Sequence, residues 1–157
     1  MATERTLILV KPDAIQRNLL GEIISRFEKK GLKIIGLKMI ELGDALIDEH
    51  YLHHLEKPFF PELKKFMQSA PVVAMALEGN KAVSATRLIV GPTKGYEADA
   101  GSIRGDLSIS GQTNIVHASD SVENAELEVE RFFKESELLV YKKIDELFLN
   151  AEDERLK

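Results

Sequence analysis

The hydrophobic residues of the chain fall into short continuous runs that alternate with runs of helical spacing. Residues 6–11 form the first continuous run, and Pro12, which cannot donate to a strand ladder, closes it. This run predicts a buried strand. Residues 20–27 then place apolar side chains at i, i+3, i+4 and i+7, and Gly31 follows as a suitable C-cap. This second pattern predicts a helix with one buried face.

The same two patterns continue through the rest of the chain. Further strands are predicted over residues 32–42, 71–77 and 114–117. Apolar residues at helical spacing within residues 46–54 and 63–67 predict two helices. Asn80 is predicted to cap a further helix that ends before Pro92. Asp120 with Glu123 resembles a capping box at the start of a last helix, which extends to Phe132.

Residues 91–111 show no sustained period and contain five glycines. We therefore expect a long loop without helix or strand. Loops of this length in compact domains are usually functional or disordered.

The element order is β-α-β, a helical insertion, β-α, the long loop, and β-α. This order predicts an α+β fold, a ferredoxin-like split βαβ sandwich with a small antiparallel sheet, helical insertions and a long loop. Without a repeat, a linker or a second core in the pattern, residues 1–157 are expected to form a single domain. The mostly charged residues 150–157 are expected to fray.

Composition narrows the functional classes. The net charge of −5 argues against a nucleic-acid-binding module, which usually carries a basic face. The absence of cysteine excludes disulfides and thiolate chemistry. Residues 7–10 are too short for a signal peptide, and no apolar run approaches the ~20 residues that span a bilayer, so a cytoplasmic protein without membrane contact is expected.

His117 is the first candidate for chemistry, because it ends a predicted strand just before a helix N-terminus, where backbone N–H groups attract anions. Glu128 lies at the edge of the following apolar stripe. A glutamate bonded to one imidazole nitrogen fixes the tautomer and leaves the other nitrogen free to attack. A strand-end histidine bonded to its own backbone is the commoner arrangement, so position alone does not decide between the two.

Other polar residues are ambiguous on their own. Lys11, Arg87 and Arg104 stand at predicted element boundaries or in the long loop, where single cations are more often solvated than ligand-bound. His50, His53 and His54 have the spacing of a metal-binding helix face, but no further ligand completes a zinc shell. Residues 104–106 read Arg-Gly-Asp, which we interpret as a coincidence.

Residues 114–121, Asn-Ile-Val-His-Ala-Ser-Asp-Ser, resemble the active-site signature of nucleoside diphosphate kinases. The resemblance runs from Glu4 to about Phe148. Five further blocks match with similar spacing: Lys-Pro-Asp at 11–13, His-Tyr at 50–51, Lys-Pro-Phe-Phe at 57–60, Gly-Ser-Ile-Arg-Gly-Asp at 101–106 and Val-Glu-Asn-Ala at 122–125.

The resemblance implies a role for each matching residue. It implies transfer of the terminal phosphoryl group from a nucleoside triphosphate to a nucleoside diphosphate, by a ping-pong mechanism through a phosphohistidine on His117. Glu128 and Ser119 would orient His117. Arg87, Thr93 and Arg104 would hold the phosphates, with Tyr51 nearby. Lys11 and Asn114 would contact the ribose, with Lys11 also near the transferred group, and Phe59 would stack on the base. Mg²⁺ would arrive with the nucleotide phosphates, with Asp120 as an outer-shell contact. A homohexamer, or alternatively a homotetramer, is also implied.

Four positions depart from the family pattern. Ala118 replaces a usual glycine, Lys94-Gly95 replaces Asn-Pro, Gly111 replaces a valine-like residue, and Leu147-Phe148 stands where tryptophan is common. None of them removes a catalytic group.

Two rival interpretations are a non-catalytic nucleotide-binding protein on the same fold and an RNA-recognition module of βαββαβ order. The presence of Lys11, His117 and Glu128 together argues against the first, because binding alone does not need an oriented nucleophile. The net charge of −5 and the lack of an aromatic RNA-binding signature on a strand argue against the second.

Overall fold

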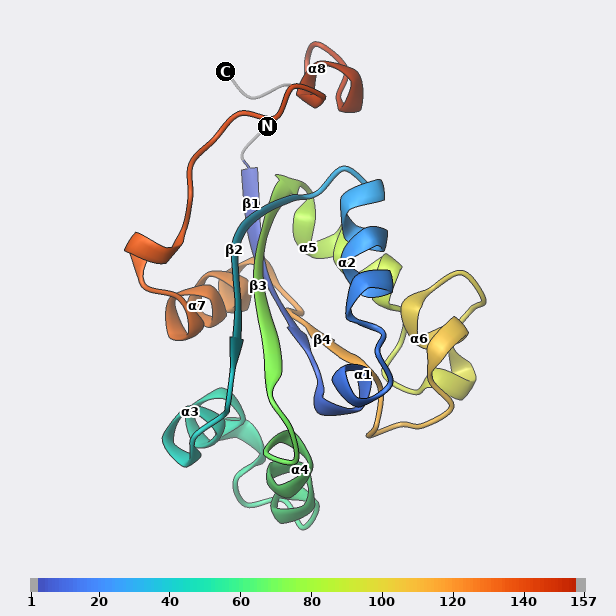
Figure 1. Cartoon of the computed structure of the whole chain (residues 1–157), viewed down its shortest axis with the longest axis vertical. Coiled ribbons are helices and arrows are strands. Elements are labelled where there is room, and N and C mark those ends of the chain that lie inside the picture. The colour runs from blue at the N-terminus through green and yellow to red at the C-terminus, as the bar shows by residue number, and fades with distance from the viewer. Residues whose placement is uncertain (1–2, 155–157) are drawn as a thin grey trace.

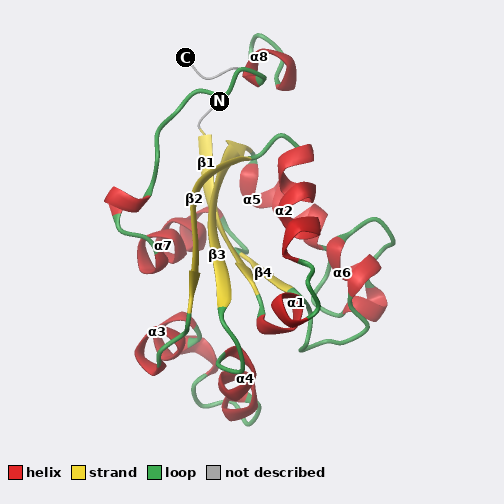
Figure 2. Ribbon diagram, in the orientation of Figure 1, coloured by secondary structure: helices red, strands yellow, loops and turns green. Residues whose placement is uncertain are grey.

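The computed structural model describes residues 3–154 and contains a four-stranded antiparallel sheet in the order β2-β3-β1-β4 (Figure 2). The strands are β1 (Thr3–Val10), β2 (Lys33–Ile40), β3 (Val72–Asn80) and β4 (Val116–Ala118). β3 lies between β1 and β2 and runs antiparallel to both, as a split βαβ unit requires. The predicted ferredoxin-like α+β arrangement is confirmed.

β1 lies inside the sheet and is covered on both faces. Leu7 and Leu9 point to one face, Ile8 and Val10 point to the other, and all four are fully buried. Helices α2 (Leu20–Lys29) and α5 (Ala82–Val90) cover one face, and α3 (Asp44–His50), α4 (Phe60–Met67) and α7 (Val122–Phe132) contribute to the core on the other (Figure 1). Burial on both sides explains why this strand reads as a continuous apolar run.

The long loop predicted for residues 91–111 is only partly a loop. It contains the 3₁₀ turn Gly95–Glu97 and the helix α6 (Ile103–Leu107), which begins where Oγ of Ser102 accepts a hydrogen bond from N–H of Gly105. A Cβ at Gly105 would lie 2.0 Å from the carbonyl oxygen of Asp99, so this helix needs its glycine. A five-residue helix is too short to produce a visible period, and the expectation was wrong for that reason.

Two predicted helix starts are also displaced. β3 continues through Asn80, Lys81 adopts a left-handed φ of 53°, and the side-chain carboxylate of Glu4 accepts the N–H of Val83 in place of an Asn80 cap. At α7 the N-cap is Ser121, whose Oγ accepts from N–H of Asn124 at 3.1 Å. Asp120 instead accepts from the side-chain amide of Asn124 at 2.7 Å.

Short elements account for most of the other differences. Helix α1 (Pro12–Gln16) follows β1 directly, with proline at its first position, and was not predicted. The stripe over 46–54 divides into α3 and the 3₁₀ turn Leu52–His54, and the strand expected at 114–117 begins two residues later, at Val116.

The C-terminal segment leaves α7, runs beside β2 and ends in α8, beyond the end of the sheet at which β1 begins (Figure 1). Leu139 donates its N–H to the carbonyl oxygen of Ile35, and Tyr141 donates its hydroxyl to that of Ile34. The 3₁₀ turn Glu135–Glu137 and α8 (Glu146–Leu149) lie in this segment. Of the tail expected to fray, residues 151–154 form a turn and residues 155–157 lie outside the described part. Within the described chain no helix is long and apolar enough to cross a membrane.

Candidate active site

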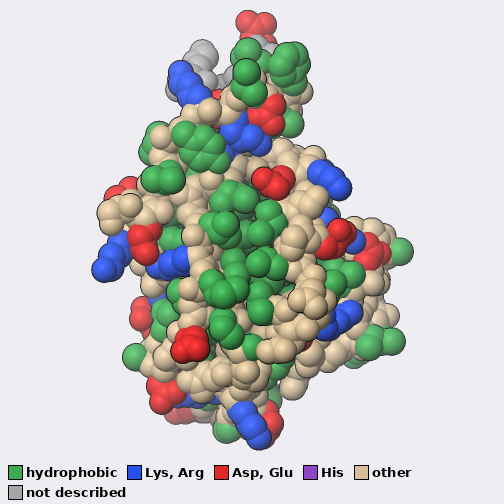
Figure 3. Space-filling view, in the orientation of Figure 1, with side chains coloured by type: hydrophobic (Ala, Val, Ile, Leu, Met, Phe, Trp, Pro, Cys, Tyr) green, Lys and Arg blue, Asp and Glu red, His purple; other side chains and the backbone are tan. Residues whose placement is uncertain are grey.

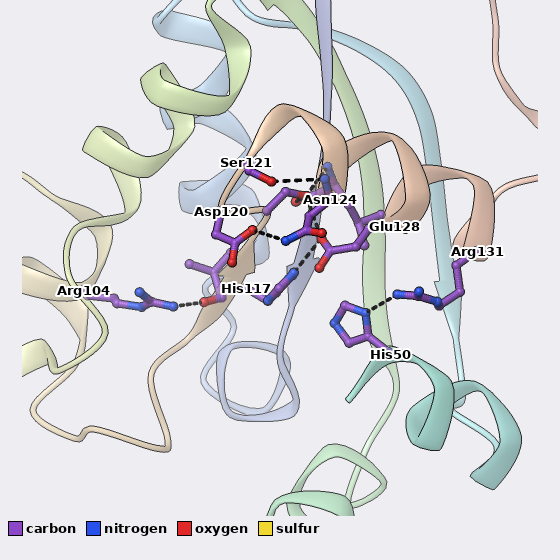
Figure 4. A network of polar contacts seen from close by, with 11 residues as sticks. His50, Arg104, His117, Asp120, Ser121, Asn124, Glu128 and Arg131 are labelled. Atoms are coloured by element: carbon purple, nitrogen blue, oxygen red, sulfur yellow. Dashed lines mark hydrogen bonds and ion pairs between the residues drawn. The ribbon is translucent and has the colours of Figure 1, made fainter. Parts of the chain in front are cut away.

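His117 lies on β4 opposite Leu9 of β1, so that its side chain faces α7. Its Nε2 donates to Oε2 of Glu128 at 2.9 Å, and Nδ1 therefore keeps its lone pair (Figure 4). The contact between β4 and α7 thus holds the imidazole of His117 in one tautomer.

Ser119 acts through Glu128 and makes no hydrogen bond with His117. Its hydroxyl donates to Oε2 of Glu128 at 2.6 Å and accepts from the buried N–H of Leu7 at 3.1 Å. Burial alone would raise the pKa of Glu128, but the hydrogen bonds from His117 and Ser119 lower this pKa to about 2. The carboxylate is therefore charged at neutral pH.

A cleft of about 750 Å³ opens beside His117. The residues expected at the site gather on its lining, namely Lys11, Tyr51, Phe59, Arg87, Thr93, Arg104, Asn114, His117, Asp120 and Glu128. Ser119, which is fully buried behind Glu128, is the one expected site residue outside the lining.

Two cations are buried in the wall of the cleft. Nζ of Lys11 donates to Oδ1 of Asn114, and burial, followed by the nearby charge of Arg104, lowers the pKa of Lys11 to about 8. Arg104 is also buried, and its guanidinium donates to the carbonyl oxygens of Gly91, Asn114 and Val116. These three bonds use three of the five N–H groups of the guanidinium, and two remain for other partners.

Arg87 differs from this pair. It is exposed at the cleft lining, and its guanidinium makes no hydrogen bond or ion pair within residues 3–154. Burial, and then Arg87 itself, lowers the pKa of Arg104 to about 10. Two arginines that line one cleft and repel each other favour a bound anion near both.

The remaining expected residues, Phe59, Tyr51 and Thr93, also line the cleft. Phe59 is 40 % exposed and meets the ring of His54 edge-on at 5.1 Å. Tyr51 is buried, which raises the pKa of its hydroxyl. The carbonyl oxygen of Thr93 accepts from the side-chain amide of Asn114 at 2.8 Å, so the amide of Asn114 is already bonded within the protein.

The zinc site considered at the three neighbouring histidines is not formed. Within the described chain, the only group of possible metal ligands combines His50 with His117 and Glu128. His50 packs edge-to-face on His117, with ring centroids 4.7 Å apart, and Arg131 lines the same cleft. Arg131 escaped the sequence interpretation, although its position three residues after Glu128 places both on one helix face.

The backbone before His117 is strained. Ile115 has a φ of 74°, which is rare for a β-branched residue, and N–H of Val116 donates to the carbonyl oxygen of Asn114 at 2.8 Å. Together these features form a classic-type γ-turn. Asp13 holds the turn by accepting N–H of Ile115 at 3.0 Å, and Lys11 donates its backbone N–H to the carbonyl oxygen of Ile115 at 2.9 Å. This turn sets Asn114 and His117 on the same cleft.

Three departures from the family pattern are accommodated locally. A Cβ at Gly95 would lie 2.3 Å from the carbonyl oxygen of Ser108, and N–H of Gly95 donates to the carbonyl oxygen of Ser110, so proline would not fit this loop. Gly111 has room for a side chain. Ala118 pairs with Ile8 inside β4 and has no positive φ.

Comparisons with known proteins agree on one family. A family model described as nucleoside diphosphate kinase matches residues 4–138. A relative of that name from Staphylococcus haemolyticus is 54 % identical over 88 % of this chain and 93 % of its own, and one from Parabacteroides distasonis is 50 % identical over 96 % and 99 %. Two solved nucleoside diphosphate kinase structures superpose closely. The structure from Halobacterium salinarum, in complex with CDP, has a TM-score of 0.93 and 38 % sequence identity, and the match covers 96 % of this chain and 100 % of that one. The structure from Babesia bovis has a TM-score of 0.91 and 41 % sequence identity, and the match covers 94 % of this chain and 99 % of that one.

Proposed function

Because the chain belongs to the nucleoside diphosphate kinase family, whose members transfer phosphoryl groups between nucleotides through a phosphohistidine, we propose that Nδ1 of His117 carries the phosphoryl group. The observation that supports this most directly is the 2.9 Å hydrogen bond from Nε2 to Glu128, which leaves Nδ1 as the free nitrogen beside the cleft.

The proposed reaction has two half-reactions. The Nδ1 lone pair attacks the terminal phosphorus of a triphosphate, the N–P bond forms, and the bond to the bridging oxygen breaks so that the diphosphate leaves with the electron pair. The positive charge that develops on the imidazole is balanced by the Glu128 carboxylate. A terminal oxygen of the acceptor diphosphate then attacks the same phosphorus, and Nδ1 recovers its lone pair.

The cations of the cleft stabilise this transfer. Phosphoryl transfer depends mainly on positioning and charge neutralisation. In this proposal Arg87 binds the phosphates with its free guanidinium, Arg104 contributes its buried charge, and Lys11 lies near the transferred group.

The remaining cleft residues bind the nucleotide. Phe59, half-exposed at the mouth, stacks on the base, which is sequence-tolerant because every base has a π-face. Asn114 and Lys11 meet the ribose, and Thr93 and Tyr51 complete the phosphate subsite. The CDP bound by the Halobacterium salinarum relative is consistent with a nucleoside diphosphate here.

Mg²⁺ fits this cleft as an ion carried by the nucleotide. It prefers oxygen ligands and keeps several waters. Glu128 is engaged by His117 and Ser119, whereas Asp120 is exposed at the cleft with one oxygen bonded to Asn124. Asp120 would hold a water of the ion, and the ion would neutralise phosphate charge.

We further propose that the single domain of residues 1–157 assembles as a cytoplasmic homohexamer or homotetramer. β2 is an edge strand, and its Leu37 and Met39 are 52 % and 57 % exposed. Figure 3 shows hydrophobic side chains gathered over the strands between α7 and α2. An apolar patch of this kind on an edge strand favours association between copies.

The proposal is tested by labelling. The protein is incubated with ATP labelled in its terminal phosphate, and acid-labile label is measured after denaturation. We expect label on the wild type, none on His117→Gln, and full label on His53→Gln, which changes another histidine of the same cleft. Label that persists in His117→Gln would refute the assignment.

Steady-state kinetics give a second test. One pocket that serves donor and acceptor in turn requires parallel double-reciprocal plots at fixed acceptor concentrations. GTP, CTP and UTP should all serve as donors, because Phe59 reads no base edge. Intersecting lines would indicate direct transfer in a ternary complex.

A further inference from the structure

His50 is the most deeply buried histidine of the cleft, and the phosphohistidine scheme gives it no task. It is 5 % exposed, and its Nε2 has no hydrogen-bond partner within the described chain. A buried imidazole nitrogen without a partner is costly, and such groups call for an explanation.

Arg131 decides which nitrogen of His50 carries the proton. Its guanidinium lies 3.4 Å from Nδ1 of His50, and its Nε donates to Oε1 of Glu49 at 3.1 Å, which fixes the arginine (Figure 4). An arginine can only donate hydrogen bonds, so Nδ1 must accept. His50 is neutral, because burial lowers its pKa to about 3. A neutral imidazole that accepts at Nδ1 carries its one proton on Nε2.

The resulting N–H group stands beside the reactive histidine. Figure 4 shows one ring nitrogen of His50 turned towards Arg131 and the other on the side of His117. Ligand atoms of His50, His117 and Glu128 lie within 4.8 Å of one another. Nε2 of His50 makes no direct hydrogen bond to His117 within the described chain, and an intervening oxygen can bridge two groups about 5–6 Å apart.

We infer that Arg131 holds His50 in its Nε2-protonated tautomer, so that His50 donates a hydrogen bond to an oxygen of the phosphoryl group while that group is bound to His117. This inference rests on the proposed function. Glu128 and Arg131, three residues apart on α7, then have parallel tasks: one fixes the tautomer of His117, and the other fixes that of His50.

The same tautomer argues against a metal ion at this cluster. A metal binds an imidazole nitrogen that carries no proton. Nε2 of His50 is protonated, and its Nδ1 faces the positive charge of Arg131. A hydrogen-bond acceptor with negative charge is the ligand that this arrangement suits.

The tautomer is tested first, in a measurement independent of turnover. Long-range ¹⁵N–¹H spectra of the labelled protein should show His50 with its proton on Nε2. Arg131→Met should produce a mixture of tautomers, whereas Arg5→Met, which removes another arginine paired with a carboxylate of α7, should leave His50 unchanged. A proton on Nδ1 in the wild type would overturn the inference.

The donor itself is tested by rapid phosphorylation from ATP. His50→Leu removes the donor and should slow phosphorylation of His117 by about 10- to 100-fold, the effect of one hydrogen bond to a charged group. His50→Gln, whose amide can donate from nearly the same place, should recover part of the rate, and affinity for ADP should change little in either variant. Equal rates in wild type and His50→Leu would refute the donor. Absence of label on the wild type would refute the proposed function and the phosphoryl part of this inference, while the tautomer result would stand.

Discussion

Burial determines the charge of individual residues in the cleft, and its effect differs from one to the next. It lowers the pKa of Lys11 to about 8 and that of His50 to about 3, because both groups lose solvation of their charged forms. Burial would raise the pKa of Glu128, but the hydrogen bonds from His117 and Ser119 outweigh this effect and lower that pKa. At neutral pH the site therefore holds a lysine cation, a neutral His50 and a carboxylate.

The lowered pKa of Lys11 predicts an alkaline limit on phosphorylation of His117. The rate should fall above about pH 8, where Lys11 loses its proton. Lys11→Arg should remove this limb, because a guanidinium stays charged, even if its overall rate is lower. Single-turnover rates between about pH 6 and about pH 10 test this, with Lys94→Arg as the exposed control. A limb unchanged in Lys11→Arg would belong to another group.

His50 predicts a pH dependence of stability. Its pKa is 6.5 unfolded and about 3 folded, so between these values only the unfolded chain binds the proton. Stability is therefore lost as the pH falls through this window, by up to about 1.4 kcal/mol per pH unit from this group. Urea unfolding at about pH 6.5 and about pH 5, at fixed protein concentration, should show a smaller loss of stability for His50→Gln than for the wild type. An equal loss in both proteins would contradict the assigned shift.

Sequence reasoning at this scale identified the expected residues of the cleft and the pairing of His117 with Glu128, but not the other partners. His117 and Glu128 follow from a strand end and the edge of a helix stripe, and the structure places them in contact. The three carbonyls that accept hydrogen bonds from Arg104 come from a loop, a γ-turn and a strand, and no spacing along the sequence predicts that these three groups lie together. The contact between His50 and Arg131 was not predicted for the same reason, because α3 and α7 meet only in the folded chain.

Among the elements, α7 carries Glu128 and Arg131, and its start is defined by one side chain. Ser121→Ala should remove the hydrogen bond from Asn124 to the cap and destabilise the protein by about 1 kcal/mol. Ser136→Ala, at an exposed serine outside any cap, should be close to neutral. Denaturant unfolding measures both, and equal stability of the two variants would show that Ser121 contributes little.

The elements predicted well are those with a long apolar pattern. The run over residues 6–11 and the stripe over residues 20–27 became β1 and α2, because burial of one strand on two faces and of one helix face leaves an unambiguous period. Helices α1 and α6 each have five residues, fewer than two full turns, and their formation depends on a proline at N1 and on the cap at Ser102. Such short elements are decided by tertiary contacts rather than by pattern.

For the whole molecule, the exposed side of β2 predicts self-association. Sedimentation at low micromolar concentration should show a species heavier than the 17.6 kDa chain. Leu37→Lys should shift the protein towards smaller species, because it places a charge on the apolar patch. Leu88→Lys, at a similarly exposed leucine on α5, serves as control. A wild type that sediments only as a 17.6 kDa species would refute the oligomer.

The inner position of β1 also matters during synthesis. This strand leaves the ribosome before the other strands of the sheet, and its partner β3 begins roughly 60 residues later and β4 roughly 105 residues later. At ~5–20 residues per second, the apolar run of residues 6–10 waits on the order of 3–20 s for its neighbours. Arg5 and Lys11 flank this run, and charges in such places act as gatekeepers against aggregation of nascent chains. Lys11, which we propose lies near the transferred phosphoryl group, thus also protects the unfinished chain.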